Sequence, residues 1–370
     1  MNSQNIPVIV ITGGPCAGKS TALNYIPEKL WAYGISSVTV PETATELLMN
    51  NVRVNQDGLS QSDFEYHLMM MMIEKEARYL EILKNYPNNK KVLICDRGLM
   101  DARPYLSPGE FEAVIEVMGL STGQIFQRYS AVFHLITAAS GAPSFYTKEN
   151  NNARIENVEQ AIQKDEENKN AWTGHPHLRI IDNSTDFEGK MKRLLQAICH
   201  HLGVPEPLEI ERRFLVDPIS ASRICEHIKV AKVPIEQCYL KSAKDGHVRV
   251  RRWGDQGSAS YYRTIKRRIS EGTRTETESS ISPREYFGAI QNEKDERFEI
   301  IQKIRHCFIW QNQYFELDIF TEPEWCRGIA ILEIELTNFN DEVLLPPFIN
   351  INSEITGNKK LGNRELARKR

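Results

Sequence analysis

The first half of the chain alternates short apolar runs with longer stretches in which apolar residues recur at helical spacing. Each run has the length of a buried strand, and each stretch between runs is long enough for a helix. Strands that alternate with helices form a parallel sheet covered by helices on both faces. The runs are VIVIT (8–12), SVTV (37–40), KVLIC (91–95), AVFHLIT (131–137) and LRIID (178–182). The pattern therefore predicts an α/β domain.

A change of pattern near residue 203 predicts a domain boundary. The helical stretch FEGKMKRLLQAICHHLG ends at Gly203 and VPEP follows, which a helix would not cross because proline lacks the amide hydrogen. Beyond it, short alternating segments are separated by turn signals such as KDG and GDQGS, which is typical of antiparallel sheet. The 370 residues are therefore expected to form two domains, residues 1–203 and 208–370.

Charged residues occupy one face of every segment in the second half. In LEIERRFLV (208–216), the period of a strand places Glu209, Glu211 and Arg213 on one face. The same alternation groups Arg249 and Arg251; Thr264, Lys266 and Arg268; Glu276 and Glu278; Lys303 and Arg305; Glu316 and Asp318; Glu333 and Glu335. A solvated face would explain any one segment. Seven segments indicate a ligand instead, because crowded like charges repel unless something separates them.

A closed or nearly closed barrel, with both signs of charge in its lumen, makes physical sense of these faces. Basic side chains would hold a chain of phosphates, and acidic ones would hold divalent cations that bridge those phosphates. The predicted triphosphate-binding residues are Arg213, Arg249, Arg251, Lys266, Arg268, Lys303 and Arg305. The predicted metal ligands are Glu209, Glu211, Glu316, Asp318, Glu333 and Glu335, and Glu209 and Glu211 are also predicted to be catalytic.

A phosphate-binding loop follows the first apolar run. ITGGPCAGKST fits the pattern G-x-x-x-x-G-K-[ST], and it lies between a predicted strand and a predicted helix, as the mechanism requires. Backbone amides and the start of the helix would bind phosphate, Lys19 would reach the outer phosphates, and Ser20 would ligate Mg²⁺. The predicted nucleotide-binding residues are Gly13, Gly14, Pro15, Cys16, Ala17, Gly18, Lys19, Ser20, Thr21 and Asn183.

Three further residues are candidates for catalysis in the first domain. Asp96 ends a predicted strand at the edge where parallel sheets bind ligands, and it would hold magnesium through water or act as a base. Glu42 also follows a strand and would face an acceptor. Arg154 opens a helical run and would close on the transferred phosphoryl group. The alternatives are helix capping for Asp96 and Glu42 and a solvated side chain for Arg154.

Composition narrows the class of partner. The net charge of −3 argues against general binding to nucleic acid or to anionic membrane. No apolar stretch reaches the length that spans a bilayer, and no charged leader precedes the first apolar run. The seven cysteines form no C-x-x-C pair and read as reduced thiols. These features predict a cytoplasmic protein with no transmembrane segment.

Both halves resemble known families. GGPCAGKST, PETATELL and CDRGLMDARPYL resemble the small P-loop ATPase and kinase group that includes the ribosylnicotinamide kinase module. EIERRFLV, VRVRR, TIKRR, KIR, ELDIF, EIE and EITGNKKLGNRELAR resemble the CYTH, or triphosphate tunnel metalloenzyme, superfamily over residues 208–370. That resemblance implies an α+β domain built on an eight-stranded antiparallel tunnel that binds triphosphate with Mg²⁺ or Mn²⁺. Arg213 stands where the superfamily usually has lysine, a change that triphosphate binding would survive better than hydrolysis would.

The combination of the two halves resembles the family of the TRPL translocation defect protein. That resemblance implies a nucleotide-binding regulator linked to membrane-protein trafficking and anionic lipid. The residues themselves favour an enzyme that binds ATP or GTP at the loop and hydrolyses or transforms an inorganic or organic triphosphate in the tunnel. A regulator whose tunnel only binds phosphate ligands, and a small-molecule kinase with an accessory tunnel, remain the alternatives.

Overall fold

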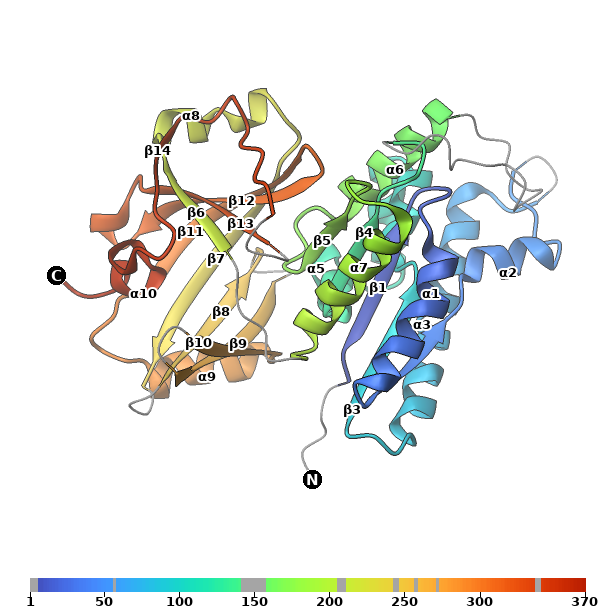
Figure 1. The fold of residues 1–370 in the computed structure, drawn as a ribbon, viewed down its shortest axis with the longest axis horizontal. Helices are drawn as coiled ribbons and strands as arrows, with labels where there is room; N and C mark the ends of the chain where they lie inside the picture. The colour runs from blue at the N-terminus through green and yellow to red at the C-terminus, as the bar shows by residue number, and fades with distance from the viewer. Residues whose placement is uncertain are drawn as a thin grey trace. The chain divides into compact units, whose positions relative to one another are not determined.

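The chain divides into two compact units, Met1–Val204 and Pro205–Arg370. The computed structural model describes residues 6–55, 58–140, 158–204, 211–241, 246–255, 259–270, 273–336 and 341–370. Within these ranges only the backbone is described for residues 222, 246, 267–270 and 273–277. Figure 1 shows the ribbon of both units, and each is considered separately below.

The first unit is built on a five-stranded sheet whose neighbouring strands are all parallel, in the order β2-β3-β1-β4-β5. The strands are β1 (Val8–Gly13), β2 (Ile35–Val40), β3 (Lys90–Asp96), β4 (Ala131–Leu135) and β5 (Leu178–Ile181). Each overlaps one of the apolar runs in the sequence, so the predicted parallel sheet is confirmed. Parallel strands buried on both faces need apolar residues at nearly every position, which is the pattern that these runs carry.

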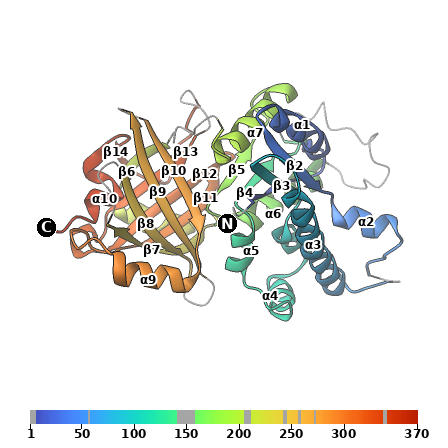
Figure 2. The same ribbon diagram turned by 90° about the horizontal axis from the view of Figure 1, so that it is seen from below.

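Helices cover both faces of this sheet. They are α1 (Lys19–Ala32), α2 (Thr43–Met49), α3 (Gln61–Lys84), η1 (Leu99–Tyr105), α4 (Pro108–Val117), α5 (Thr122–Arg128), α6 (Val158–Trp172) and α7 (Phe187–His201). Figure 2 shows α1 and α7 on one face and α3, α5 and α6 on the other. The α1 and α7 side includes Leu30 and Leu194, which pack with Ile11 and Phe133 in one fully buried cluster. This packing fixes the loop between β1 and α1.

The second unit contains a nine-stranded sheet in which every neighbouring pair is antiparallel, in the order β10-β9-β8-β7-β11-β12-β13-β6-β14. The strands are β6 (Glu211–Val216), β7 (Ala231–Leu240), β8 (Gly246–Trp253), β9 (Ser260–Ser270), β10 (Thr273–Ser280), β11 (Ile301–Trp310), β12 (Gln313–Glu322), β13 (Ala330–Glu335) and β14 (Ile351–Glu354). The predicted antiparallel sheet is therefore confirmed.

The sheet differs from the expected eight-stranded barrel in strand number and in closure. Its edge strands are β10 and β14, and within the described ranges these two strands do not pair with each other. The extra strand, β14, is the short polar segment INSE, which pairs with β6. A four-residue polar strand has no alternation strong enough to be recognised from sequence, and closure depends on pairing between distant segments that no single strand pattern reveals.

Helices pack on one face of the second sheet, the face opposite the charged side chains. On this face Phe308, Phe315, Leu317 and Leu332 are fully buried and pack with residues of α8 (Pro218–Ser222) and η3 (Ile224–Glu226). Another helix, α9 (Pro283–Glu293), packs on β7, β8 and β9. The remaining helical segments are η4 (Glu324–Cys326), η5 (Lys359–Leu361) and α10 (Asn363–Leu366). Within the described residues, no helix has the length and apolar character needed to cross a membrane.

The aromatic pair Phe308 and Phe315 gives a test of this packing. Their rings stack with centroids 5.6 Å apart, and both side chains are 0% exposed. We expect Phe308→Ala to lower the free energy of unfolding of the second unit by about 3–5 kcal/mol, because it removes apolar contacts and leaves a cavity. Urea denaturation measures this, with Phe287→Ala as the control because Phe287 is 56% exposed. Equal losses for the two variants would contradict the assigned core.

Candidate functional site

The loop between β1 and α1 has a backbone that only small residues permit. Gly13 has a φ of 147° and Gly18 a φ of 94°, both in the region that favours glycine. A Cβ on Gly13 would lie 2.2 Å from the carbonyl oxygen of Leu135, and a Cβ on Gly18 would lie 2.8 Å from the Phe187 ring. The loop therefore packs tightly against β4 and α7, with its amides at the start of α1, where backbone N–H groups favour anions.

Lys19 is the cation of this loop. Its Nζ donates to the carbonyl oxygens of Gly13, at 2.9 Å, and Gly14, at 3.0 Å. Burial lowers the pKa of Lys19 to about 8, and the nearby Arg97 acts in the same direction, whereas the carboxylates around it oppose the change. A phosphate bound beside Lys19 would raise its pKa again, because a nearby negative charge favours the protonated, charged form. Ser20 and Thr21 follow in the exposed first turn of α1.

Two residues from distant parts of the chain hold the loop in place. The Asp165 carboxylate on α6 accepts a hydrogen bond from the Gly14 amide at 2.7 Å and lies 3.1 Å from His134 Nε2. Lys190 on α7 is 3% exposed and donates to the Ala17 carbonyl oxygen at 3.0 Å. The sequence did not single out Asp165 or Lys190, because neither stands in a motif.

Acidic and basic side chains gather at the carboxyl ends of the strands beside the loop. Arg97 has a φ of 70°, and its Nε donates to Glu42 Oε1 at 2.5 Å. A non-glycine residue in this left-handed region is uncommon and marks a position that the surrounding structure imposes. Asp101 accepts a hydrogen bond from Thr12 and one from the Gly98 amide at 2.8 Å. The group forms a polar edge on which a phosphate or an acceptor hydroxyl could be held.

Asp96 has a buried carboxylate oxygen, Oδ1, without a hydrogen-bond partner among the described residues. Burial raises the pKa of Asp96 to about 6, and the neighbouring Glu42 adds to this, while Lys19 and Arg97 oppose it. Unpaired buried carboxylates are rare in folded proteins, and a carboxyl group that titrates near neutrality suits a general base.

The remaining predicted residues of the first unit have different surroundings. Glu42 occupies the N-cap position of α2, but its side chain makes no capping hydrogen bond and pairs with Arg97 instead. Asn183 donates to the carbonyl oxygens of Thr137 and Ser140 and accepts a hydrogen bond from Lys190 at 2.8 Å. Its side-chain amide is therefore hydrogen-bonded within the fold. Arg154 lies outside the described residues.

The charged face of the second sheet forms a continuous network of buried ion pairs. Arg305 Nε and Nη2 donate to Asp318 at 2.7 Å and 2.6 Å, and Nη2 lies 3.2 Å from Glu333. Arg305 also pairs with Glu316, and Lys303 with Asp318. The network continues through Arg213, whose Nε donates to Glu333 at 2.8 Å. Antiparallel pairing of β11, β12, β13 and β6 brings these residues together.

Two acids of this network have pKa values that are shifted in opposite directions. Burial raises the pKa of Asp318, but Arg305 and Lys303 more than offset it and leave that pKa well below its usual value. Burial raises the pKa of Glu316. The positive charge of Arg305 lowers this pKa, but not enough to offset the effect of burial. Glu316 is therefore the acid of this face that protonates more readily.

A second group of charges lies on β8, β9 and β10. Arg251 Nη2 donates to Glu278 Oε2 at 2.8 Å, and the Thr264 hydroxyl donates to the same oxygen at 2.8 Å. Arg249 Nη1 lies 3.3 Å from Gln237 Oε1. Lys266 is on β9 and is half-buried. The side chains of Arg268 and Glu276 are outside what the structure describes.

The predicted metal ligands do not form one cluster among the described residues, which contain no group of three His, Cys, Asp or Glu side chains able to hold a metal ion. Glu316, Asp318 and Glu333 each pair with Arg305 instead. Glu211 and Glu335 are cross-strand partners at the end of β6 and β13, and Glu211 lies 3.8 Å from Arg213. Glu209 is outside the described residues. The carboxylates have the oxygen chemistry that Mg²⁺ prefers, and Mg²⁺ commonly takes one or two of them together with substrate phosphates.

Comparison with known proteins identifies the class of the first unit. Residues 8–190 match the model of a family described as AAA domain. Together with the loop geometry above, this match shows that the first unit is a P-loop-like nucleotide-binding domain. No curated protein matches the chain.

Solved structures resemble the chain more distantly. The inorganic triphosphatase NE1496 is 24% identical over 43% of this chain and 94% of its own, with a TM-score of 0.30. The PH1012 protein from Pyrococcus horikoshii OT3 is 22% identical over 36% of this chain and 80% of its own, with a TM-score of 0.28. The NadR protein in complex with NR is 14% identical over 55% of this chain and 53% of its own, with a TM-score of 0.40.

The buried Asp96 carboxyl group should make the stability of the first unit depend on pH. Its pKa of about 6 in the fold exceeds the ordinary value of 3.8, so the native state favours the protonated form. Stability is therefore lost as pH rises from 4 through 6. Asp96→Asn removes this loss and should raise the free energy of unfolding by about 2–3 kcal/mol at pH 8, with little change at pH 4.

Urea denaturation at pH 4, 6 and 8 measures this difference. Glu74→Gln is the control, because Glu74 is exposed on α3 and its replacement should leave the pH dependence unchanged. A stability gain that is the same at all three pH values would contradict a buried, ionising Asp96.

Proposed function

We propose that the protein binds ATP or GTP with a divalent cation at the loop of the first unit, and that the charged face of the second unit binds and hydrolyses a triphosphate-containing molecule. The observation that carries the second part is the burial of its basic side chains. Arg213 is 6% exposed, Arg251 9%, Lys303 3% and Arg305 5%. A solvated face would leave such side chains in water, so solubility does not account for them.

The free-energy cost of burying these charged side chains favours a functional explanation for them. Removing charges from water is expensive, and buried ion pairs commonly stabilise a fold less than apolar residues of similar size would. A row of buried arginines and lysines, alternating with carboxylates on neighbouring strands, offers the groups that bind phosphates and phosphate-bound Mg²⁺ or Mn²⁺. We therefore assign triphosphate binding to Arg213, Arg249, Arg251, Lys266, Arg268, Lys303 and Arg305.

At the first unit the roles follow from position. The amides of the loop and Lys19 would hold the nucleotide phosphates, and Ser20 at the start of α1 would ligate Mg²⁺, with Asp96 nearby to bind its water. A bound divalent ion would supply charge that offsets the developing charge on the phosphates. Arg154, whose position the structure does not describe, is proposed to add a positive charge to the same phosphates.

Two alternatives rest on particular residues. Arg213 stands where a proton-relaying lysine would be expected, and this favours a regulator whose charged face binds phosphate ligands without hydrolysis. Anionic lipid belongs to that alternative and rests on family resemblance alone. The unpaired Asp96 carboxyl group, with its pKa of about 6, favours a kinase that transfers phosphate from the nucleotide to a small hydroxyl acceptor.

The loop assignment predicts the effect of Lys19→Ala. Because Lys19 reaches only the phosphates at its own loop, the variant should lose at least tenfold in affinity for ATP or GTP at the first unit, while the affinity of the second unit for tripolyphosphate is unchanged. Isothermal titration of both ligands with Mg²⁺ measures this. Lys29→Ala is the control, because Lys29 is exposed near the end of α1. Full nucleotide affinity in Lys19→Ala would exclude the loop as the binding site.

The assignment of the charged face predicts the effect of Glu209→Gln combined with Glu211→Gln. Removing two carboxylates should weaken Mn²⁺ binding in the presence of tripolyphosphate by at least tenfold and abolish metal-dependent phosphate release, because hydrolysis needs the cation to polarise the phosphoryl group. The fold should lose no more than about 1 kcal/mol, because the Glu211 side chain is 41% exposed and lies 3.8 Å from Arg213.

Calorimetry and phosphate release measure the two effects on wild type and variant. Glu226→Gln is the control, because this carboxylate is exposed and pairs with Arg223 away from the charged face. Unchanged Mn²⁺ affinity together with full activity would refute the metal assignment. Tight binding of tripolyphosphate by the wild type without any phosphate release would support the regulator.

A further inference from the structure

Three neighbouring strands of the second sheet present a different surface on the face opposite the charged one. Lys303 and Arg305 of β11 point to the charged face, so Ile304 and His306 point to the other. Strand register places Ile304 beside Pro234 of β7 and Ile319 of β12, and places His306 beside Lys232 of β7. A row of apolar side chains therefore lies next to Lys232 and the His306 imidazole.

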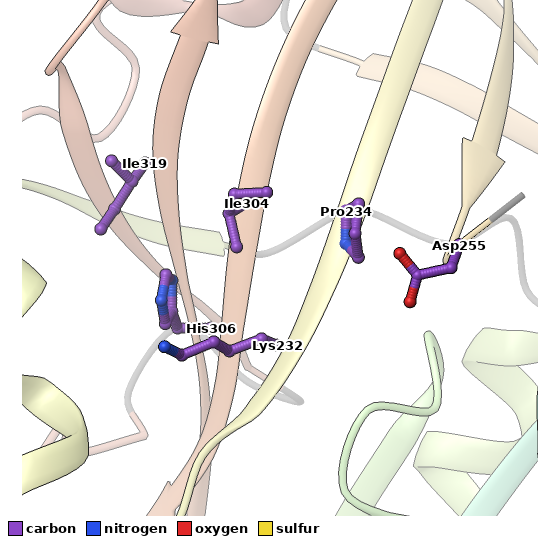
Figure 3. Close-up of a pocket in the computed structure, with 6 residues that line it drawn as sticks. All are labelled: Lys232, Pro234, Asp255, Ile304, His306 and Ile319. Atoms are coloured by element: carbon purple, nitrogen blue, oxygen red, sulfur yellow. The ribbon is translucent and has the colours of Figure 1, made fainter.

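These residues line a pocket of about 480 Å³, together with Asp255. Figure 3 shows Pro234, Ile304 and Ile319 along its floor, His306 and Lys232 together at one end, and the Asp255 carboxylate at the other. The Gly254 amide donates to the Pro234 carbonyl oxygen at 2.9 Å, which holds the neighbouring Asp255 beside β7. The pocket is open on one side, so a small molecule would lie against its floor and would not be enclosed.

The same face is covered on both sides of this pocket. Towards one end of the strands, Phe308 and Leu317 pack with Ile224 of η3. Towards the other end, Tyr286 of α9 donates its hydroxyl to Glu236 of β7 at 3.0 Å. Among the described residues the pocket thus lies between these two covered parts of the face and is open on its outer side.

His306 indicates what the pocket would hold. Its side chain is 7% exposed, and its Nδ1 is buried with no hydrogen-bond partner among the described residues. Burial lowers the pKa of His306, and the neighbouring Lys232 lowers it further, while hydrogen bonding to the backbone of Ile304 and Leu317 opposes the change. Buried polar atoms without partners are rare and call for an explanation such as a ligand. Lys232 is exposed at the rim and supplies a positive charge.

We propose that this pocket binds a small organic anion with a flat apolar body. Its anionic group would lie at Lys232 and His306, its apolar body on Pro234, Ile304 and Ile319, and a hydrogen-bond donor, where present, towards Asp255. The apolar floor disfavours a bare inorganic phosphate, which needs polar partners on every side. The single lysine at the rim disfavours a highly charged ligand. This site is separate from the charged face and does not depend on the function proposed for it.

Methyl NMR of the full chain, labelled at the isoleucine δ1 carbons, provides a direct test. The probes are 2-naphthoate and its uncharged counterpart 2-naphthamide. We expect 2-naphthoate to shift the Ile304 and Ile319 signals, which Ile304→Val and Ile319→Val assign, and to bind at least fivefold more tightly than 2-naphthamide. Tripolyphosphate at saturation should not displace it, because the charged face is on the other side of the sheet.

Matched variants at the two ends of the pocket distinguish recognition of the anionic group from non-specific apolar binding. Lys232→Gln should weaken 2-naphthoate at least fivefold and leave 2-naphthamide unchanged, whereas Asp255→Asn should not weaken 2-naphthoate. Both residues are exposed, and unchanged methyl spectra of the free variants show that the fold is intact. The proposal is overturned if neither methyl signal shifts, if the two probes bind equally, or if Lys232→Gln binds 2-naphthoate as wild type does.

Discussion

A guanidinium group removed from water has to be surrounded by anionic partners, and Arg305 imposes this requirement on the second unit. Asp318 takes two of its hydrogen bonds, and Glu316 and Glu333 lie around the rest. The partners come from two neighbouring strands, β12 and β13. A shift of either strand by one residue would turn its carboxylates to the opposite face and leave Arg305 unpaired. The register of three strands is therefore tied to one buried cation.

The two units treat buried charge in opposite ways. The charged face of the second unit is internally neutralised, because the described basic groups of its central network have carboxylate partners. The edge of the first unit is incompletely neutralised. Asp96 has a buried oxygen without a partner, and Lys19 donates to carbonyl oxygens of its own loop. A phosphate can replace those carbonyl partners without breaking an ion pair, so the first site is already prepared for an anion.

Local patterns were enough to predict much of this protein. The five parallel strands, the loop ending in Lys19 and the alternation of charge along the antiparallel strands are all encoded over a few residues. The partners of the loop were not predictable in this way. Asp165 is 151 positions from Gly14, and Lys190 is 173 positions from Ala17, so only folding brings them together. The open sheet was missed for a related reason, because closure depends on whether the edge strands β10 and β14, which are far apart in the sequence, pair with each other.

The neutralised state of the charged face constrains how any triphosphate could bind there. A phosphate that took Arg305 as its partner would leave Glu316 buried without its cation. Asp318 and Glu333 would each keep one basic partner, Lys303 and Arg213. Divalent cations remove that difficulty, because each displaced carboxylate gains a new positive partner while the phosphates take the arginine and lysine. Neither the anion nor the metal alone completes this exchange. The arrangement of ion pairs on this face therefore favours joint binding of triphosphate and metal over binding of either one alone.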